Sequence, residues 1–294
     1  MKYLLTGGSG FLGGILKDSL RQNHDVVTLG RSITNGIIAD LSMEEPILPP
    51  VDVIIHVAGK AHIVPKTENE KAEFFRVNVT GTKNLLKGIK VLPKSFVFIS
   101  TVAVYGLDEG RLIKETEELK GDTPYARSKI EAEKLVQDWG IKNQVNVLIL
   151  RLPLVVGPNA PGNLGAMVKA IKNGFYFRLG DGNARKSMVL AEDVAGLVGD
   201  CENMEGVYNL TDGQNPSMAE FDTYLASCFN RKVKGFPQGF LNFAAKIGDT
   251  FKSFPLNSYR VEKLQTSLTF SCAKAEKDFG WKPRSVIGNF DPRL

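Results

Sequence analysis

Tyr125 and Lys129 are the residues of this sequence whose types and spacing suggest acid–base chemistry. They lie four positions apart in the predicted helix Pro124–Trp139, so we expect them on one helix face, with Thr123 as the N-cap. The pKa of a phenol is about 10, which is too high for proton transfer at neutral pH. A nearby ammonium group stabilises the phenolate and brings that pKa closer to neutrality. The pair therefore predicts a tyrosine that exchanges a proton with a bound substrate.

A glycine-rich turn joins the predicted strand Tyr3–Thr6 to the predicted helix Phe11–Arg21. In dinucleotide-binding folds the first glycine of such a turn permits the sharp bend. The second lets the backbone approach a pyrophosphate, and the third lets helix and strand pack closely. The amides of the first helical turn then donate to the phosphates. The cofactor contacts that we expect here are Gly7, Gly10, Phe11, Leu12 and Gly13.

The residues after the second and third predicted strands indicate which dinucleotide is bound. NAD-binding chains usually place an acidic residue after the second strand, where it bonds the ribose 2′-hydroxyl. Here Arg31 and Ser32 follow the strand Val26–Leu29, and an arginine suits a 2′-phosphate. Asp40 and Leu41 lie at the end of the short strand Gly36–Asp40, where an adenine edge is expected. The sequence thus favours NADP(H), with NAD(H) as the alternative.

Short apolar runs that alternate with helical patterns must position these residues. The runs Val51–Gly59, Phe96–Ser100 and Val145–Leu150 are nearly continuous, as expected of strands buried on both faces, and Phe74–Lys90 reads as a helix. Such alternation predicts an α/β fold with a doubly wound parallel sheet of the Rossmann type. Thr101 directly follows one of these strands, so its hydroxyl is expected beside the reacting carbonyl oxygen.

The pattern changes after residue 152, where prolines and glycines cluster. We predict a Rossmann domain over residues 1–152, with a return to the sheet over about 188–212 through Met188–Leu197 and Val207–Leu210. A smaller substrate-binding lobe is predicted over 153–187, with a helix at Leu164–Asn173, and over 213–294. This lobe would lie over the carboxyl edge of the sheet, where open α/β folds bind ligands.

Composition excludes several other classes of protein. The 294 residues are 43% hydrophobic, which is enough for a large core, and the net charge of +5 comes from scattered Lys and Arg, which argues against nucleic acid as a partner. No stretch has the apolar length of a membrane span. Three widely spaced cysteines form neither a disulfide framework nor a metal pair. We therefore expect a cytoplasmic protein without a metal site.

Taken together, these motifs resemble the extended short-chain dehydrogenase/reductases that act on nucleotide sugars. The matching segments are Thr6–Gly13, His56–Gly59, Asn78–Thr82, Phe98–Gly106, Pro124–Lys134, Leu150–Pro158 and Glu192–Ala195. The resemblance implies that Thr101, Tyr125 and Lys129 are catalytic, and that Lys129 also holds the nicotinamide ribose. It adds further cofactor contacts at Val57, Ala58, Gly59, Asn78 and Pro153.

Three further segments resemble bacterial reductases of UDP-4-keto-6-deoxy-N-acetylhexosamines in surface-polysaccharide biosynthesis, namely Gly157–Leu164, Asn183–Val189 and Ser267–Phe270 with Phe279–Pro283. Leu154 stands where many epimerases have a substrate-contacting asparagine. The substrate contacts that we expect are Asn163, Arg185, Lys186 and Arg260.

This resemblance leaves two alternatives to an NADPH-dependent 4-keto reductase. One is a 4-epimerase of UDP-glucose or UDP-N-acetylglucosamine that keeps its NAD bound. The other is a non-catalytic NADP-binding scaffold, against which the intact set of Thr101, Tyr125 and Lys129 argues. The helices Phe74–Lys90 and Tyr125–Trp139 are candidates for a homodimer interface, as is common in the family.

Overall fold

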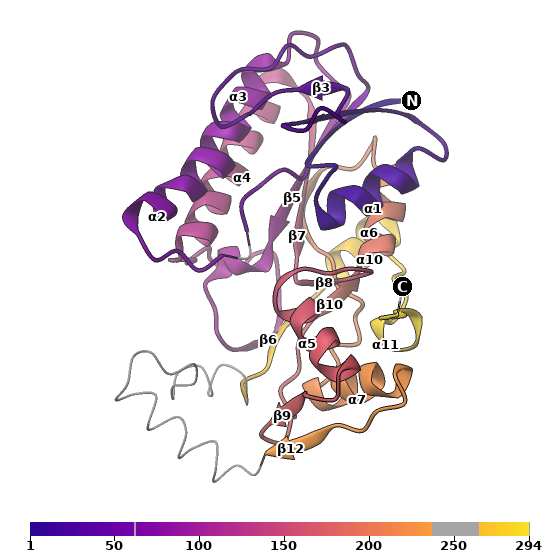
Figure 1. Ribbon diagram of the computed structural model, residues 1–294. Helices are drawn as coiled ribbons and strands as arrows, with labels where there is room; N and C mark the ends of the chain where they lie inside the picture. Colours follow the sequence, from indigo (N-terminus) through magenta and orange to yellow (C-terminus); the bar gives the residue numbers. More distant parts are fainter. Residues whose placement is uncertain (62, 237–264, 294) are drawn as a thin grey trace.

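A parallel sheet of seven strands forms the centre of the protein. The computed structural model describes residues 1–61, 63–236 and 265–293. Within them, the strand order in the sheet is β11-β7-β5-β4-β1-β2-β3, and every neighbouring pair is parallel (Figure 1). The strands are β1 (Lys2–Thr6), β2 (Asp25–Gly30), β3 (Ile37–Ile38), β4 (Val53–His56), β5 (Ser95–Thr101), β7 (Asn146–Leu152) and β11 (Gly206–Asn209). The order reverses between β1 and β4, which is where folds of this kind bind their ligands.

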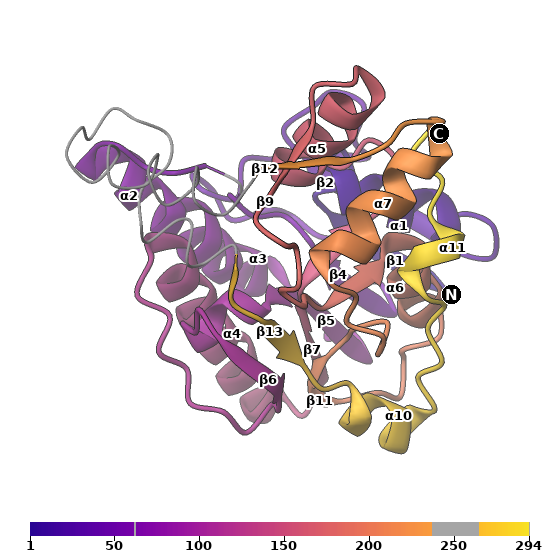
Figure 2. The same cartoon turned by 90° about the horizontal axis from the view of Figure 1, so that it is seen from below.

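Helices cover both faces of this sheet. Helices α1 (Phe11–Leu20) and α6 (Ala191–Gly199) lie together on one face, and α2 (Glu68–Phe75), α3 (Gly81–Gly88) and α4 (Pro124–Asn143) lie on the other (Figures 1 and 2). Helix α4 begins as predicted, with the Thr123 hydroxyl accepting from the amide of Ala126 at 3.1 Å. No helix of the described residues is long and apolar enough to cross a membrane.

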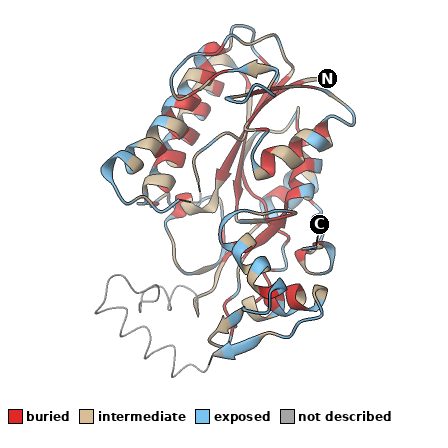
Figure 3. Ribbon diagram, in the orientation of Figure 1, coloured by how far each residue is buried: buried red, intermediate tan, exposed pale blue. Residues whose placement is uncertain are grey.

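The strands are apolar because their side chains alternate between two buried layers. In β1, Tyr3 and Leu5 pack under α1 and α6, whereas Leu4 packs under the other helices. In β5, Phe96 and Phe98 belong to the second of these layers. Period-two alternation is the rule for a strand, and here both sets are buried, as the inner strands in Figure 3 show. The expected doubly wound parallel sheet is confirmed.

The segment from Glu68 to Gly88 is one helical run with a π-helical turn in its middle. The π turn, η1, covers Arg76–Thr80 between α2 and α3. The predicted single helix Phe74–Lys90 is therefore interrupted, and it begins earlier than expected, at the capping box formed by Thr67 and Glu70. Single π turns inside helices are frequent at functional sites, and this one carries Asn78.

Apart from the main sheet, the described residues form three small two-stranded sheets and an apolar cluster that is separate from the two layers flanking the sheet. The pairs are β8 (Leu154–Val156) with β10 (Met188–Leu190), β9 (Phe177–Leu179) with β12 (Lys234–Phe236), and β6 (Gly110–Ile113) with β13 (Leu268–Phe270). Helices α5 (Gly162–Lys172) and α7 (Met218–Cys228) pack together in this separate apolar cluster, and α11 (Val286–Asn289) contacts α7. The proposed substrate lobe stays a prediction.

Two expected returns to the sheet have different outcomes. Of Met188–Leu197, only Met188–Leu190 is a strand, and it pairs with β8 outside the main sheet, after which α6 begins. The segment Val207–Leu210 does return, because β11 pairs with β7 at the edge of the main sheet. Helix α10 (Ala273–Phe279) also comes back to this layer, since Ala275 and Trp281 pack in the same core as α1.

Candidate active site

The glycine turn has the geometry that close contact with a pyrophosphate requires. Gly7 has a φ of +74°, and a Cβ there would lie 2.7 Å from the amide nitrogen of Ala58. A Cβ on Gly13 would lie 2.0 Å from the Gly7 carbonyl oxygen, so only glycine lets α1 approach the turn this closely. The Gly10 amide donates to the Gly7 carbonyl at 2.9 Å, which closes the turn.

The N-terminus of helix α1 is suited to an anion. Its N-cap is Gly10, so no side chain bonds the first amides of the helix, and Gly10 is exposed. Phe11 is half-buried, and Leu12 and Gly13 are buried. Free amides at a helix start, together with the helix dipole, bind phosphate groups. The turn and this helix start therefore fit the diphosphate of a dinucleotide.

A chain of hydrogen bonds through His56 joins the carboxyl ends of β1 and β4. The hydroxyl of Thr82 donates to the carbonyl oxygen of Asn78 at 2.6 Å, so it accepts from His56 Nε2 at 2.9 Å. His56 Nδ1 then accepts from the Thr6 hydroxyl at 2.7 Å, and Thr6 Oγ1 accepts from the Ala58 amide at 3.1 Å. Burial lowers the pKa of His56 to about 3, so the ring is neutral, as this chain of bonds requires. Ala58, beside the half-buried Val57, is thereby fixed against the glycine turn.

Asn78 fixes the next segment of the site. Its Oδ1 accepts from the Lys60 amide at 2.6 Å, and its Nδ2 donates to the Lys60 carbonyl at 3.1 Å and to Ser128 Oγ at 2.9 Å. Ser128 Oγ in turn donates to the Tyr125 carbonyl at 2.7 Å. A Cβ on Gly59 would lie 3.2 Å from Asn78 Oδ1, so this loop passes close to the asparagine. Asn78 thus ties the loop after β4 to helix α4.

Tyr125 and Thr101 meet at the carboxyl end of β5. Tyr125 lies in the first turn of α4, half-buried, with its ring 6.2 Å from that of Phe74. Burial raises the pKa of the phenol above its ordinary value, while a hydrogen bond with Thr101 lowers it. Thr101 is the last residue of β5, and its Oγ1 also accepts from the Ala103 amide at 3.2 Å. The two hydroxyls are therefore close enough to contact one oxygen atom.

Lys129 lies one turn further along α4 and is buried. Its Nζ donates to the carbonyl oxygen of Ile99 at 2.6 Å and lies 3.9 Å from the centre of the Phe98 ring. Burial lowers the pKa of Lys129 to about 7, although the carboxylate of Glu133 opposes this shift. Lys129 and Tyr125 share one helix face, as the spacing predicts. In this structure, however, the Lys129 ammonium group donates its hydrogen bond to the backbone of β5 rather than to the phenol of Tyr125.

The residues expected at the adenosine end lie after β2 and β3. Arg31 and Ser32 are exposed beyond β2, and Ser32 Oγ and Thr34 Oγ1 share a hydrogen bond of 2.9 Å. Asp40 is half-buried, and bonds from Ser42 together with the positive charge of Arg31 hold its pKa below the ordinary value. Leu41 is buried in the core under α3 and α4. An exposed cation therefore stands where the ribose of a dinucleotide would end.

The expected substrate contacts are more dispersed. Asn163 is exposed in the first turn of α5, whose start has no side-chain cap. Arg185 is exposed and already bonded, since its Nη1 donates to the Asn215 carbonyl at 3.0 Å and lies 3.6 Å from a carboxylate oxygen of Glu220. Lys186 is half-buried, and its backbone forms an isolated parallel β-bridge with that of Leu268. Pro153 is half-buried between β7 and β8, next to the exposed Leu154. Arg260 lies outside the described residues.

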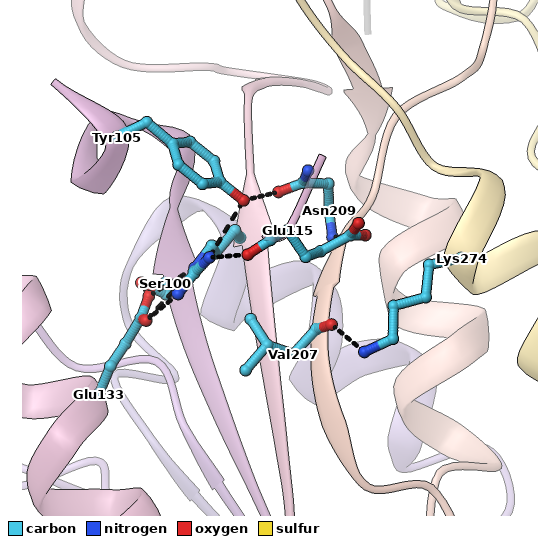
Figure 4. A network of polar contacts seen from close by, with 8 residues as sticks. Ser100, Tyr105, Glu115, Glu133, Val207, Asn209 and Lys274 are labelled. Atoms are coloured by element: carbon cyan, nitrogen blue, oxygen red, sulfur yellow. Dashed lines mark hydrogen bonds and ion pairs between the residues drawn. The ribbon is translucent and has the colours of Figure 1, made fainter. Parts of the chain in front are cut away.

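A buried polar network behind Tyr125 and Lys129 was missed by sequence reasoning. Its centre is the ion pair of Arg151 with Glu133, in which Nη2 and Oε2 are 2.7 Å apart (Figure 4). The signal was present in the sequence: Arg151 interrupts the apolar end of a strand, and Glu133 follows Lys129 by one helical turn. A charged residue inside an apolar strand needs a buried partner, but sequence alone did not identify which one.

Comparison with known proteins identifies the family of the chain. The model of the NAD dependent epimerase/dehydratase family matches residues 3–198. The chain is 28% identical to a UDP-glucose 4-epimerase of Vibrio cholerae (97% of this chain and 91% of that protein) and 27% identical to a GDP-6-deoxy-D-mannose reductase of Pseudomonas aeruginosa (97% and 93%). The fold is similar to the structure of RMD from Pseudomonas aeruginosa complexed with NADPH, with a TM-score of 0.75 and 24% identity over 97% of this chain and 94% of that one. The expected family and the expectation of an NAD(P)-dependent enzyme are thereby confirmed, and the chain belongs to the NAD dependent epimerase/dehydratase family.

Proposed function

We propose that the protein is an NADPH-dependent reductase that acts at C4 of a nucleotide sugar. The observation that carries the proposal is the meeting of Thr101 and Tyr125 at the end of β5, with Lys129 buried one turn away on the same helix. Two strands away, β1 ends in the glycine turn. A pure binding protein has no need of these three side chains together. The similarity to both an epimerase and a reductase supports chemistry at C4 of the sugar.

The residues present fit a bound dinucleotide. A side chain at Gly7 or Gly13 would collide with backbone, and the start of α1 has no side-chain cap. The diphosphate would be held by the amides of Phe11 and Leu12. When bound, the nicotinamide supplies the hydride that reduces the C4 carbonyl.

The chain's own residues handle the proton. Tyr125 donates its hydroxyl proton to the C4 oxygen as that oxygen gains negative charge, and Thr101 donates a hydrogen bond to the same atom. A protonated Lys129 stabilises the phenolate that remains on Tyr125. A proton from solvent then restores the phenol. The ordinary pKa of a phenol is too high for this step, so the nearby ammonium is needed to bring it closer to the working pH.

The preference for NADP(H) is part of the proposal. The exposed Arg31 at the end of β2 supports it, because an acidic residue in that position would repel a 2′-phosphate. For the rest of the cofactor, the expected contacts are Val57, Ala58 and Gly59 after β4, and Pro153 after β7. NAD(H) is the alternative, and it would accompany an epimerase.

The proposed substrate is a UDP-4-keto-6-deoxy-N-acetylhexosamine. Asn163 at the start of α5, with Arg185 and Lys186 before β10, would bind its diphosphate. The side chain of Leu154 is apolar and exposed beside β10, which suits the 6-deoxy carbon better than a hydroxyl. Arg260 is a further proposed contact. A homodimer through α3 and α4 stays a prediction, and the outer residues of α4 are mainly charged.

A cofactor balance separates the two catalytic alternatives. A reductase consumes one NADPH per product, so absorbance at 340 nm should fall in proportion to the UDP-4-keto-6-deoxy-N-acetylhexosamine supplied. An epimerase returns its hydride and would interconvert UDP-glucose and UDP-galactose, or their N-acetyl forms, without net consumption. The similarity to a UDP-glucose 4-epimerase makes this the second candidate. Tight NADPH binding without either reaction would support the scaffold instead.

A further inference from the structure

The polar network behind the candidate active site is almost completely buried. The side chains of Glu133 and Arg151 are 3% and 6% exposed. Arg151 Nη1 donates to the Tyr105 hydroxyl at 3.1 Å, and Tyr105 donates to Asn209 Oδ1 at 2.7 Å (Figure 4). The backbone amide of Asn209 donates to Oε1 of the Glu115 carboxylate at 2.9 Å. Every charge in the network therefore has a partner, as a buried charge requires.

The Glu133 carboxylate connects α4 with the ends of β5 and β7, the elements that carry or directly precede candidate site residues. Glu133 lies on α4, one turn beyond Lys129. The Ser100 hydroxyl donates to Glu133 Oε1, and Ser100 directly precedes Thr101 at the end of β5. Arg151 donates to both carboxylate oxygens from the end of β7. A single carboxylate therefore sets the position of α4 relative to the ends of two strands.

Glu133 is also the acidic group that acts on Lys129. On α4 itself, Tyr125 and Glu133 flank the lysine by one turn each. His56, at the end of β4, faces Lys129 as a neutral ring. From β5, the Ile99 carbonyl and the Phe98 ring contact the ammonium group of Lys129. Arg151 lies behind Glu133. Glu133 raises the pKa of Lys129 against the larger effect of burial.

We propose that Glu133 is a positioning residue, whose carboxylate fixes Lys129 in place and in its charged form relative to the ends of β5 and β7. A buried ion pair is a weak source of stability, because well-packed apolar side chains of similar volume often do as well. The placement of this pair behind Tyr125 and Lys129 therefore indicates a role in the reaction. This inference rests on the proposed function, because it assigns Lys129 to catalysis.

Replacing Glu133 with Gln keeps its shape but removes its charge. Without that charge, Lys129 loses its proton at lower pH, so the alkaline limb of the kcat profile should move down by about one pH unit. Activity should recover towards wild type on acidification, which a purely structural defect would not do. Glu133→Asp keeps the charge with a shorter reach, so it should lower kcat while leaving the limb in place.

Asp222→Asn provides a control at a second ion pair, whose carboxylate is buried and whose arginine is half-buried. Asp222 is fully buried and bonded by Arg178 Nε at 2.9 Å, far from α4 in sequence and on α7. This variant should lower the melting temperature without moving the limb. If Glu133→Gln does not fold, the double variant Glu133→Gln/Arg151→Met removes both members of the ion pair, so that no arginine is left buried without its partner, and its limb should still lie below that of wild type.

A measurement without substrate separates this inference from the proposed function. The side-chain ¹⁵N resonance of Lys129, assigned with Lys129→Arg, can be followed against pH in the free protein. Its midpoint should fall by about one pH unit in Glu133→Gln and stay unchanged in Asp222→Asn. If wild type reduces no sugar but this midpoint falls, the proposed function fails and the effect of Glu133 on Lys129 stands. If neither the midpoint nor the limb moves in Glu133→Gln, the inference is wrong.

Discussion

The substitution Gly13→Ala tests the glycine turn directly. The added Cβ would lie 2.0 Å from the Gly7 carbonyl oxygen and 2.7 Å from its carbon, where an ordinary contact begins at 3.4 Å. Helix α1 or the turn must therefore move by about 1.4 Å to accept one methyl group. The opposing atoms are backbone on both sides, so no side-chain rotation can relieve the overlap.

This displacement should reduce both stability and cofactor binding. Overpacking of this kind costs roughly 1–3 kcal/mol. For a chain of this size, that lowers the melting temperature by about 2–5 °C. The amides at the start of α1 would move by more than 1 Å from the phosphates, which is a large error for a hydrogen bond. We expect the Kd for NADPH to rise by about tenfold or more, equivalent to roughly 1.4 kcal/mol.

The adjacent Gly14 provides the control. A Cβ there meets nothing closer than the Gly8 carbonyl oxygen at 3.9 Å, so Gly14→Ala adds helix propensity without a clash. It should stabilise the protein by up to about 1 kcal/mol and leave the Kd unchanged. Calorimetric titration with NADPH and thermal unfolding measure both effects. Equal NADPH affinities in the two variants would refute the assigned role of the turn.

Three further predictions concern single side chains. Tyr125→Phe should abolish turnover, measured as NADPH oxidation, while the Kd for NADPH changes less than about twofold, because only the proton donor is lost; a near-normal rate would contradict the assignment. Arg31→Ala should weaken binding of NADPH far more than binding of NADH in paired titrations, and equal losses would argue against a 2′-phosphate contact. His56 has a folded pKa of about 3 against roughly 6.5 when unfolded, so protons bind the unfolded chain preferentially between these values and stability should fall as pH drops through them. The urea midpoint should therefore decrease on acidification less steeply in His56→Gln than in wild type, and parallel slopes would show that His56 is not the group responsible.

The sheet and the glycine turn were predictable because their signals are local. A continuous apolar run such as that around Ile54 reports burial on both faces, and the spacing of Gly7 and Gly13 reports a close helix approach. The i, i+4 spacing of Tyr125 and Lys129 likewise follows from helix geometry alone. These features depend on neighbouring residues, so one sequence suffices to find them.

Contacts between distant segments were not predictable in this way. The pairing of β6 with β13 joins residues more than 150 positions apart, and no local sequence pattern predicts this pairing. The same holds for the bond from Tyr105 to Asn209. The early start of α2 could have been read from Thr67 and Glu70, whose spacing is that of a capping box. The π turn over Arg76–Thr80 has no comparable signature in the sequence.

The π turn constrains the number of residues in the helical run from Glu68 to Gly88. Each residue of an α-helix advances the chain by about 100°. Deleting Val77 would restore a regular helix, yet with α3 anchored by Thr82 and Leu85 it would rotate α2 by that angle and carry Phe74 away from the Tyr125 ring. One-residue insertions and deletions, which surface loops readily tolerate, should therefore be selected against between Arg76 and Thr80, whatever residue they add or remove.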